Sequence, residues 1–184
     1  MTSLVERARA VAMETLSDLP SRRAHTVGVA GTARSIAEHL SLSGSDAVVA
    51  AAWLHDVGYA DHVAVTGFHP VDGATFVKDH AFPDSVVSLV AYHTGAETEA
   101  AERGLSDALA RFDRPDPVML DVLTFSDLTV GPEGENVDVE SRITEILSRY
   151  PDAHPVNRAV ARSSPALLAA AQRVKRLIAG VDAR

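Results

Sequence analysis

The helical spacing of apolar residues, interrupted by proline, is the feature that most constrains how this chain of 184 residues can fold. Apolar residues recur mostly three and four positions apart, which is typical of amphipathic helices and not of strands. The nine prolines fall where such segments begin or end. Because proline fixes φ and lacks an amide hydrogen, these positions indicate helix boundaries. The sequence therefore predicts an all-α bundle of about eight to ten helices.

Capping residues and glycines give the limits of these helices. Ser3 and Glu6 form a capping box at the first helix, and Gly58 is a predicted helix stop. On the second helix, Gly28 and Gly31 are expected to let another backbone come close. The predicted helices cover Ser3–Leu19, Ser21–Leu40, Asp46–Val57, Pro70–Asp79, Asp84–His93, 97–111, 117–129, 139–149, 155–162 and 166–179.

Composition excludes several classes of protein. The chain has no cysteine, which rules out disulfides, cysteine–zinc sites, iron–sulfur clusters and a cysteine nucleophile. With 25 acidic and 17 basic residues, the net charge of −8 argues against bulk nucleic-acid binding. The longest apolar run, Ala47–Leu54, is too short to span a membrane, and no secretory signal is visible. We expect a cytoplasmic protein without membrane contact. The sequence allows a homo-oligomer without requiring one.

Ionisable residues on the apolar faces of predicted helices are the main functional signal. His25 shares a face with Val29, and His93 shares one with Val86 and Leu89. Asp127 lies on an apolar face of the helix over 117–129. The apolar run AVVAAAWL leads directly into His55 and Asp56, which places this pair near the middle of the molecule.

Buried groups of this kind need partners. An isolated buried carboxylate is very costly, and an unpaired neutral polar group costs about 1–3 kcal/mol. A divalent cation satisfies several such groups at once, because imidazole and carboxylate are its natural ligands. Taken singly, an inward histidine is more often a hydrogen-bonded core residue, and an aspartate at a helix end is more often a cap. The order of the residues along the chain favours a metal site.

The ordered set His25, His55-Asp56 and Asp127 resembles the HD-domain superfamily of metal-dependent phosphohydrolases, named for its His…His-Asp…Asp motif. The resemblance covers about residues 21–130 and implies a single domain over 1–184, with a helical extension over 139–184. It implies that these four residues ligate one divalent ion. Many members use two further histidines for a second ion, and His69 and His93 occupy suitable places.

The resemblance also implies an activity. We expect hydrolysis of a phosphate ester, from a nucleotide or another small phosphorylated metabolite, with His55 and Asp56 as catalytic residues. One or two divalent ions (Mn, Fe, Mg, Co, Ni or Zn) are the expected cofactors. The chain departs from two branches of the superfamily. It has Tyr59 where one branch has lysine, and it has Tyr59 and Ala60 where another branch has a Glu-Asp pair. The resemblance therefore does not identify the substrate.

An acidic chain needs basic side chains near its site if an anionic substrate is to bind. Arg22 and Arg23 precede His25 by three and two residues and are candidates for substrate binding, with Lys78 and Arg142 as further candidates. The alternative for Arg22 and Arg23 is solvated surface. For Arg142 it is an i, i+3 ion pair with Glu145.

Two other functions are compatible with these residues. A minority of the superfamily uses iron and O₂, so the six candidate ligands also allow a di-iron oxygenase. A non-catalytic module that binds a nucleotide is the third hypothesis. Retention of all six candidate ligands argues against a degenerate domain.

Overall fold

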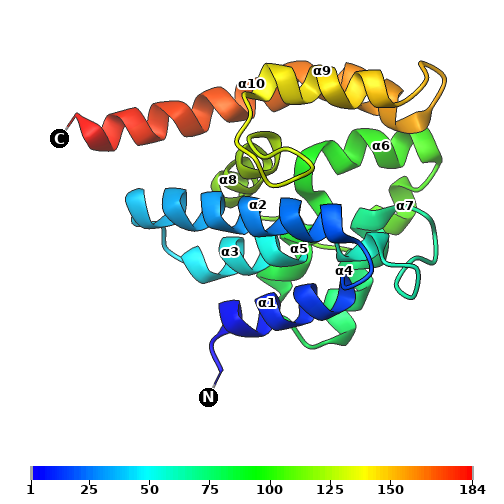
Figure 1. The fold of residues 1–184 in the computed structure, drawn as a ribbon, viewed down its shortest axis with the longest axis horizontal. Helices are drawn as coiled ribbons and strands as arrows, with labels where there is room; N and C mark the ends of the chain where they lie inside the picture. The colour runs from blue at the N-terminus through cyan, green and yellow to red at the C-terminus, as the bar shows by residue number, and fades with distance from the viewer. Residues whose placement is uncertain (1, 184) are drawn as a thin grey trace.

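We describe residues 2–183 of the chain from a computed structural model. These residues form helices and connecting loops, and their only β-type pairing is an isolated bridge between Val130 and Asn136. The predicted all-α fold is confirmed (Figure 1). The helices are α1 (Leu4–Thr15), α2 (Pro20–His39), α3 (Ser45–Leu54), η1 (Val57–Tyr59), α4 (His69–Asp79), α5 (Asp84–Tyr92), η2 (His93–Gly95), α6 (Ala96–Arg103), α7 (Ser106–Leu109), α8 (Pro117–Leu128), α9 (Val139–Arg149) and α10 (Pro155–Asp182).

Helix α3 lies at the centre of the bundle. All eight residues of its apolar run, Ala47–Leu54, are buried, as expected of a helix that is apolar on every side. It packs against α1 and α2 on one side and contacts α5 and α8 elsewhere. His55 and Asp56 follow α3 directly, and both are buried. Because they follow this buried helix, His55 and Asp56 lie as a polar pair in the core.

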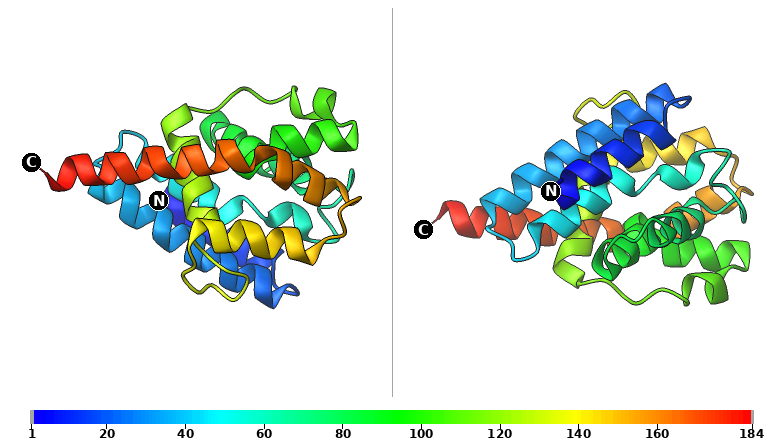
Figure 2. Two further views of the ribbon diagram at one scale, coloured as in Figure 1. Left: turned by 90° about the horizontal axis from the view of Figure 1, so that it is seen from above. Right: turned by 90° about the horizontal axis from the view of Figure 1, so that it is seen from below.

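The C-terminal part of the chain forms a cover of α8, α9 and α10 over one side of the bundle (Figures 1 and 2). A second cluster of apolar side chains, which includes Leu128, Ile143 and Leu167, holds these three helices together. The end of α10 extends beyond the other helices in all views. The first part of this helix packs on the bundle through buried residues that include Leu167 and Val174.

Several predicted helix boundaries are wrong. The helix expected to stop at Gly58 ends at Leu54, and Gly58 lies inside the short helix η1. The first helix ends at Thr15 and not at Leu19.

We expected a break at Pro165, but α10 continues through it as one helix of 28 residues. Buried residues lie on both sides of Pro165, Ala159 and Leu167 among them, and this packing offsets the hydrogen bond that proline removes. The helix expected over 97–111 is divided at Gly104, whose φ of +70° ends α6 in the left-handed conformation.

Other local predictions are confirmed. The Ser3–Glu6 capping box is present with both of its hydrogen bonds. Gly28 allows a close approach, because a Cβ there would lie 2.6 Å from Val130 Cγ1. Gly31 has no such neighbour within 4 Å, so the prediction for this glycine is wrong. No helix within residues 2–183 has both the length and the apolar composition needed to cross a bilayer.

Candidate metal centre

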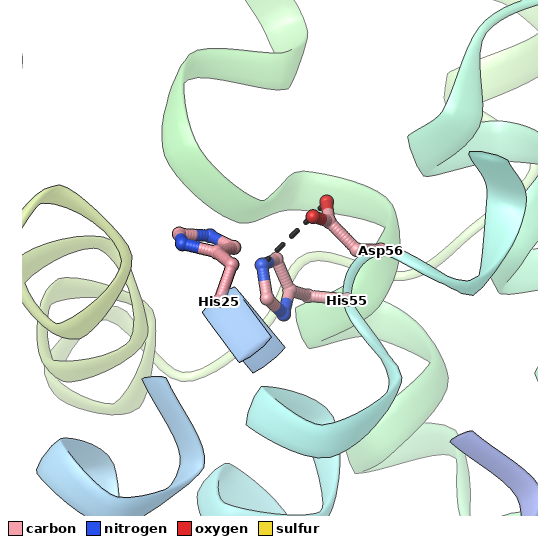
Figure 3. A group of neighbouring side chains, drawn as sticks. All are labelled: His25, His55 and Asp56. Carbon is pink, nitrogen blue, oxygen red and sulfur yellow. Dashed lines mark ion pairs between the residues drawn. The ribbon is translucent and has the colours of Figure 1, made fainter. Parts of the chain in front are cut away.

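The end of α3 and the first turns of α2 bring three candidate ligands together. His25 comes from α2, and His55 and Asp56 follow α3; Figure 3 shows their side chains facing one another. Each residue offers one ligand atom, and these atoms lie within 4.8 Å of one another. Their side chains are at most 4% exposed. We call His25, His55 and Asp56 the first group.

Hydrogen bonds to main-chain carbonyls fix the imidazole rings of the first group. His55 Nδ1 lies 2.9 Å from the carbonyl oxygen of Ala52, and His25 Nδ1 lies 3.1 Å from that of Gly131. A carbonyl only accepts, so each Nδ1 must carry the proton and donate it. In the neutral ring Nε2 then has a free lone pair, and in both histidines it is Nε2 that faces the carboxylates. Burial lowers the pKa of His25, but the hydrogen bond to Asp127 and the charge of that carboxylate outweigh burial and raise that pKa. A cation here therefore competes with a proton between His25 Nε2 and Asp127.

The loop over 129–138 supplies one of these carbonyls because glycines let it approach α2. Gly134 has a φ of +82°, and a Cβ there would lie 2.7 Å from the carbonyl oxygen of Ala24. This close approach holds the loop against α2 and puts the Gly131 carbonyl beside His25. The orientation of His25 therefore depends on a loop more than 100 residues away in sequence.

Asp127, near the end of α8, lies beside the first group. Its Oδ1 is 2.9 Å from His25 Nε2 and 3.9 Å from His55 Nε2. Its Oδ2 accepts a hydrogen bond from the Thr94 hydroxyl. The structure thus brings all four residues of the predicted motif to one place, from α2, the end of α3 and α8.

Asp56, His69 and His93 form the second group of candidate ligands. His69 begins α4 and His93 follows α5, and their Nε2 atoms lie 3.1 Å apart. Asp56 Oδ1 lies 3.8 Å from His69 Nε2 and 3.5 Å from His55 Nε2. Asp56 therefore belongs to both groups, as the two-ion version of the motif requires.

The charge states of these residues suit cation binding. Burial by itself raises the pKa of Asp56, but the nearby His55 and Arg22 outweigh it and hold that pKa far below its usual range. The pKa of Asp127 is also well below its usual range, because the His25 hydrogen bond and His55 outweigh its burial. Burial lowers the pKa of both His69 and His93, and the neighbouring imidazoles lower it further. Two carboxylates are thus ionised beside two neutral imidazoles.

The donor set is incomplete without a cation. Among the described residues, His55 Nε2 is buried and has no hydrogen-bond partner. The Nε2 atoms of His69 and His93 face each other, although His93 already donates from Nδ1 to the Val90 carbonyl. Imidazole lone pairs that are buried without a donor, as at His55 Nε2, are costly. Divalent cations take these ligands, so the residues present fit a metal centre.

Comparison with known families agrees with this geometry. The family model described as HD domain matches residues 22–150, which contain all six candidate ligands. The chain belongs to the HD domain family. This family consists mostly of metal-dependent hydrolases. Comparisons with curated proteins and with solved structures gave no match.

Arg22 is the substrate-binding candidate that lies closest to the ligands of this HD domain. Its Nη1 donates to Asp56 Oδ2 over 3.0 Å, and its guanidinium lies 3.8 Å from the ring centroid of Tyr59. The Tyr59 ring also stacks on His69, with 4.0 Å between ring centroids. Tyr59 therefore orients both His69, a candidate ligand, and the guanidinium of Arg22. One branch of the superfamily has lysine at this position.

The other basic candidates differ in position. Arg142, on α9, is buried and lines the cavities beside His25 and His93. It also forms the expected ion pair with Glu145, at 2.6 Å. Arg23 lines neither of these cavities. Lys78 is exposed near the end of α4 and lines a different cavity, so the structure does not bring it to the ligands.

Three residues of the site were not among the sequence candidates. Tyr59 was noted only as a departure from the superfamily pattern, and Thr94 and Arg149 were not considered. Arg149 lines the same cavities as Arg142. It follows Arg142 by seven residues, and this spacing puts both side chains on one face of a helix. That periodicity was available in the sequence, whereas the contact between Thr94 and Asp127 depends on tertiary packing.

Proposed function

We propose that this HD domain is a metal-dependent hydrolase of small phosphate esters. The observation that carries the proposal is the clustering of His25, His55, Asp56 and Asp127, in which the Nε2 atoms of both histidines face the two carboxylates. His69 and His93 extend this arrangement on the other side of Asp56. The proposed cofactor is one ion in the first group and a second ion in the second group.

The chain's own residues have distinct parts in this proposal. His25, His55, Asp56 and Asp127 would hold the first ion, and Asp56, His69 and His93 the second. A divalent cation bound there polarises a phosphoryl oxygen and makes water a better nucleophile near neutral pH. Thr94 holds the Asp127 carboxylate by donating to its second oxygen. The main-chain carbonyls hold His25 and His55 in the tautomer that leaves Nε2 free.

The surroundings of the ligands favour a phosphorylated substrate. The cavity bounded by His69 and His93 is also lined by Arg22, Arg142 and Arg149. Guanidinium groups bind phosphate oxygens through paired hydrogen bonds. We favour the hydrolase over the di-iron enzyme because hydrolysis of a phosphate ester uses both the arginines and the divalent ions, whereas no feature of the described residues calls for O₂ chemistry. Loss of activity on substitution of His55 separates a hydrolase from a module that only binds nucleotides.

Metal analysis combined with an activity screen tests the proposed function. The purified chain is assayed for bound metal and for phosphate release from a panel of nucleotides and sugar phosphates with Mn²⁺, Co²⁺, Mg²⁺ and Ni²⁺. We expect metal-dependent release that His55→Ala abolishes, while His62→Ala, a substitution in an exposed loop, leaves it unchanged. Release that is equal in the wild type and His55→Ala, or absent with every metal, overturns the proposal.

A further inference from the structure

Three arginines separate two small cavities beside the metal centre. One cavity, of about 90 Å³, is bounded by His69, His93 and residues of α9 and α10. The other, also of about 90 Å³, is bounded by Ser21, His25 and Pro132. Only three residues line both cavities, and these are Arg22, Arg142 and Arg149. Since one water molecule needs about 10–15 Å³, each cavity has room for a small polar group.

One carboxylate holds both α9 arginines. Glu145 accepts hydrogen bonds from Arg142 Nη1 over 2.6 Å and from Arg149 Nη2 over 2.6 Å. Arg149 is about one-third exposed, whereas the Arg142 side chain is only 6% exposed. Among the described residues, Arg142 Nε is buried and has no hydrogen-bond partner. Arginine rarely lies buried with a free donor, because an unpaired buried group is costly.

A free surface ion pair does not explain this arrangement. Pairs at i, i+3 and i, i+4 on an exposed helix face contribute little, and their side chains point into water. Here the two arginines face the cavities next to His25 and His93, and the buried one retains an unused donor. A ligand with several acceptor oxygens would satisfy that donor. We infer that Arg142 and Arg149 bind the phosphate of the substrate from the α9 side of the metal centre and select a phosphate monoester over a diester.

Charge balance supports the choice of a monoester. Three carboxylates balance the three arginines Arg22, Arg142 and Arg149, namely Asp56, Asp127 and Glu145. Glu99 also lines the first cavity, but it pairs with Arg103 at 2.7 Å. Each divalent cation bound at the centre therefore adds an excess of two positive charges. A phosphate monoester carries a charge of about −1.5 to −2 near pH 7. With one or with two ions bound, a monoester offsets more of this excess than a diester, which carries a single negative charge.

This inference rests on the proposed function for its substrate comparison, but phosphate binding tests it separately. Arg149→Met removes the charge and keeps much of the apolar stem. Arg173→Met is the matched control, because Arg173 pairs with Asp121 between α10 and α8 and lines neither cavity. By calorimetry with inorganic phosphate on the metal-loaded full chain, we expect about tenfold weaker binding for Arg149→Met and no change for Arg173→Met. Equal affinities in the two variants overturn the inference.

A pair of chromogenic esters tests the selectivity. We expect the wild type to hydrolyse p-nitrophenyl phosphate with a higher kcat/KM than bis(p-nitrophenyl) phosphate, and Arg149→Met to lose about tenfold on the monoester and less than threefold on the diester. A wild-type preference for the diester, or equal losses on both esters, overturns the inference and leaves phosphohydrolase activity established. If neither ester is hydrolysed and the nucleotide and sugar phosphate panel is also inert, the proposed function fails, and phosphate binding then decides this inference by itself.

Discussion

The two groups of candidate ligands share Asp56 but hold their imidazoles by different means. In the first group, His25 and His55 each donate from Nδ1 to a main-chain carbonyl, and both side chains are almost fully buried. In the second group, His93 has such a bond, to the Val90 carbonyl. His69 has none within residues 2–183; its ring stacks on Tyr59 and its side chain is 14% exposed.

This difference predicts an order of metal affinity. A hydrogen bond from Nδ1 fixes both the tautomer and the rotation of the ring, so the free lone pair is already directed at the ion. Stacking fixes the plane of a ring but not the nitrogen that carries the proton. We therefore expect the first group to bind its ion more tightly, and the second ion to be lost first on dialysis.

The largest effect should come from Asp56→Ala, which removes the carboxylate common to both groups. We expect loss of bound metal and a fall in kcat/KM of at least about 10³-fold, because neither group retains its ligand set. Metal content and phosphate release are the measurements. Asp61→Ala makes the same change of charge in an exposed loop and should leave both unchanged. Full metal content in Asp56→Ala contradicts the shared role.

A smaller effect, on one group only, is expected from His69→Ala. The variant should retain about one equivalent of tightly bound metal and lose the weaker one, with activity lowered about 10- to 100-fold. Equilibrium dialysis followed by elemental analysis measures the stoichiometry. If His69→Ala loses both ions while His25→Ala retains one, the order of affinity given above is reversed.

Gly58→Ala should disturb the second group from within the main chain. A Cβ at Gly58 would lie 2.1 Å from the carbonyl oxygen of His69, so the start of α4 must shift. We expect a loss of about 1–3 kcal/mol in the free energy of unfolding, as for other overpacked sites, and weaker binding of the second ion. Gly31→Ala, in α2, meets no atom within 4 Å and should be neutral or up to about 1 kcal/mol more stable. Urea unfolding measures the free energy of unfolding of both variants. Equal values would show that the start of α4 can shift without loss of stability.

The smallest effect is expected from Thr94→Val, which acts on the first group. It removes the hydroxyl that donates to Asp127 Oδ2 and keeps the β-branched shape. We expect about tenfold weaker binding of the tighter ion, because the carboxylate loses one of its orienting contacts. Thr129→Val is the control, since that hydroxyl donates to the main chain at the end of α8. Metal affinity that is unchanged in Thr94→Val means that Asp127 is oriented without the threonine.

Local patterns predicted most of the fold because helix periodicity and caps depend on neighbouring residues. The limits of α8 and α9 lie within one residue of the predicted ones, and α3 is buried as its uniform apolarity indicated. The division of 97–111 at Gly104 was missed, although a glycine in the left-handed conformation is a common helix stop. The continuity of α10 through Pro165 was missed because packing on distant helices outweighs a local breaker.

The site was predictable where its residues are polar groups on apolar faces or directly follow an apolar helix, whereas His69 was predicted only from the family resemblance. His25, His55, Asp56, His69, His93 and Asp127 all meet in the structure, whereas Lys78 lies elsewhere. Basic side chains gave a weaker signal because arginine and lysine are common on any surface. Arg142 shows both expected features at once, since it pairs with Glu145 and also faces the cavity.

The sequence by itself determined the helical class and the residues that must be buried, because both follow from apolar periodicity over a few turns. Only the tertiary structure decided that Asp56 serves two groups, that the Gly131 carbonyl orients His25, and that Arg142 and Arg149 line the cavities beside His25 and His93. These relations join residues from helices and loops that are far apart in the chain. Their geometry is set by how the helices pack, and no local pattern specifies that packing.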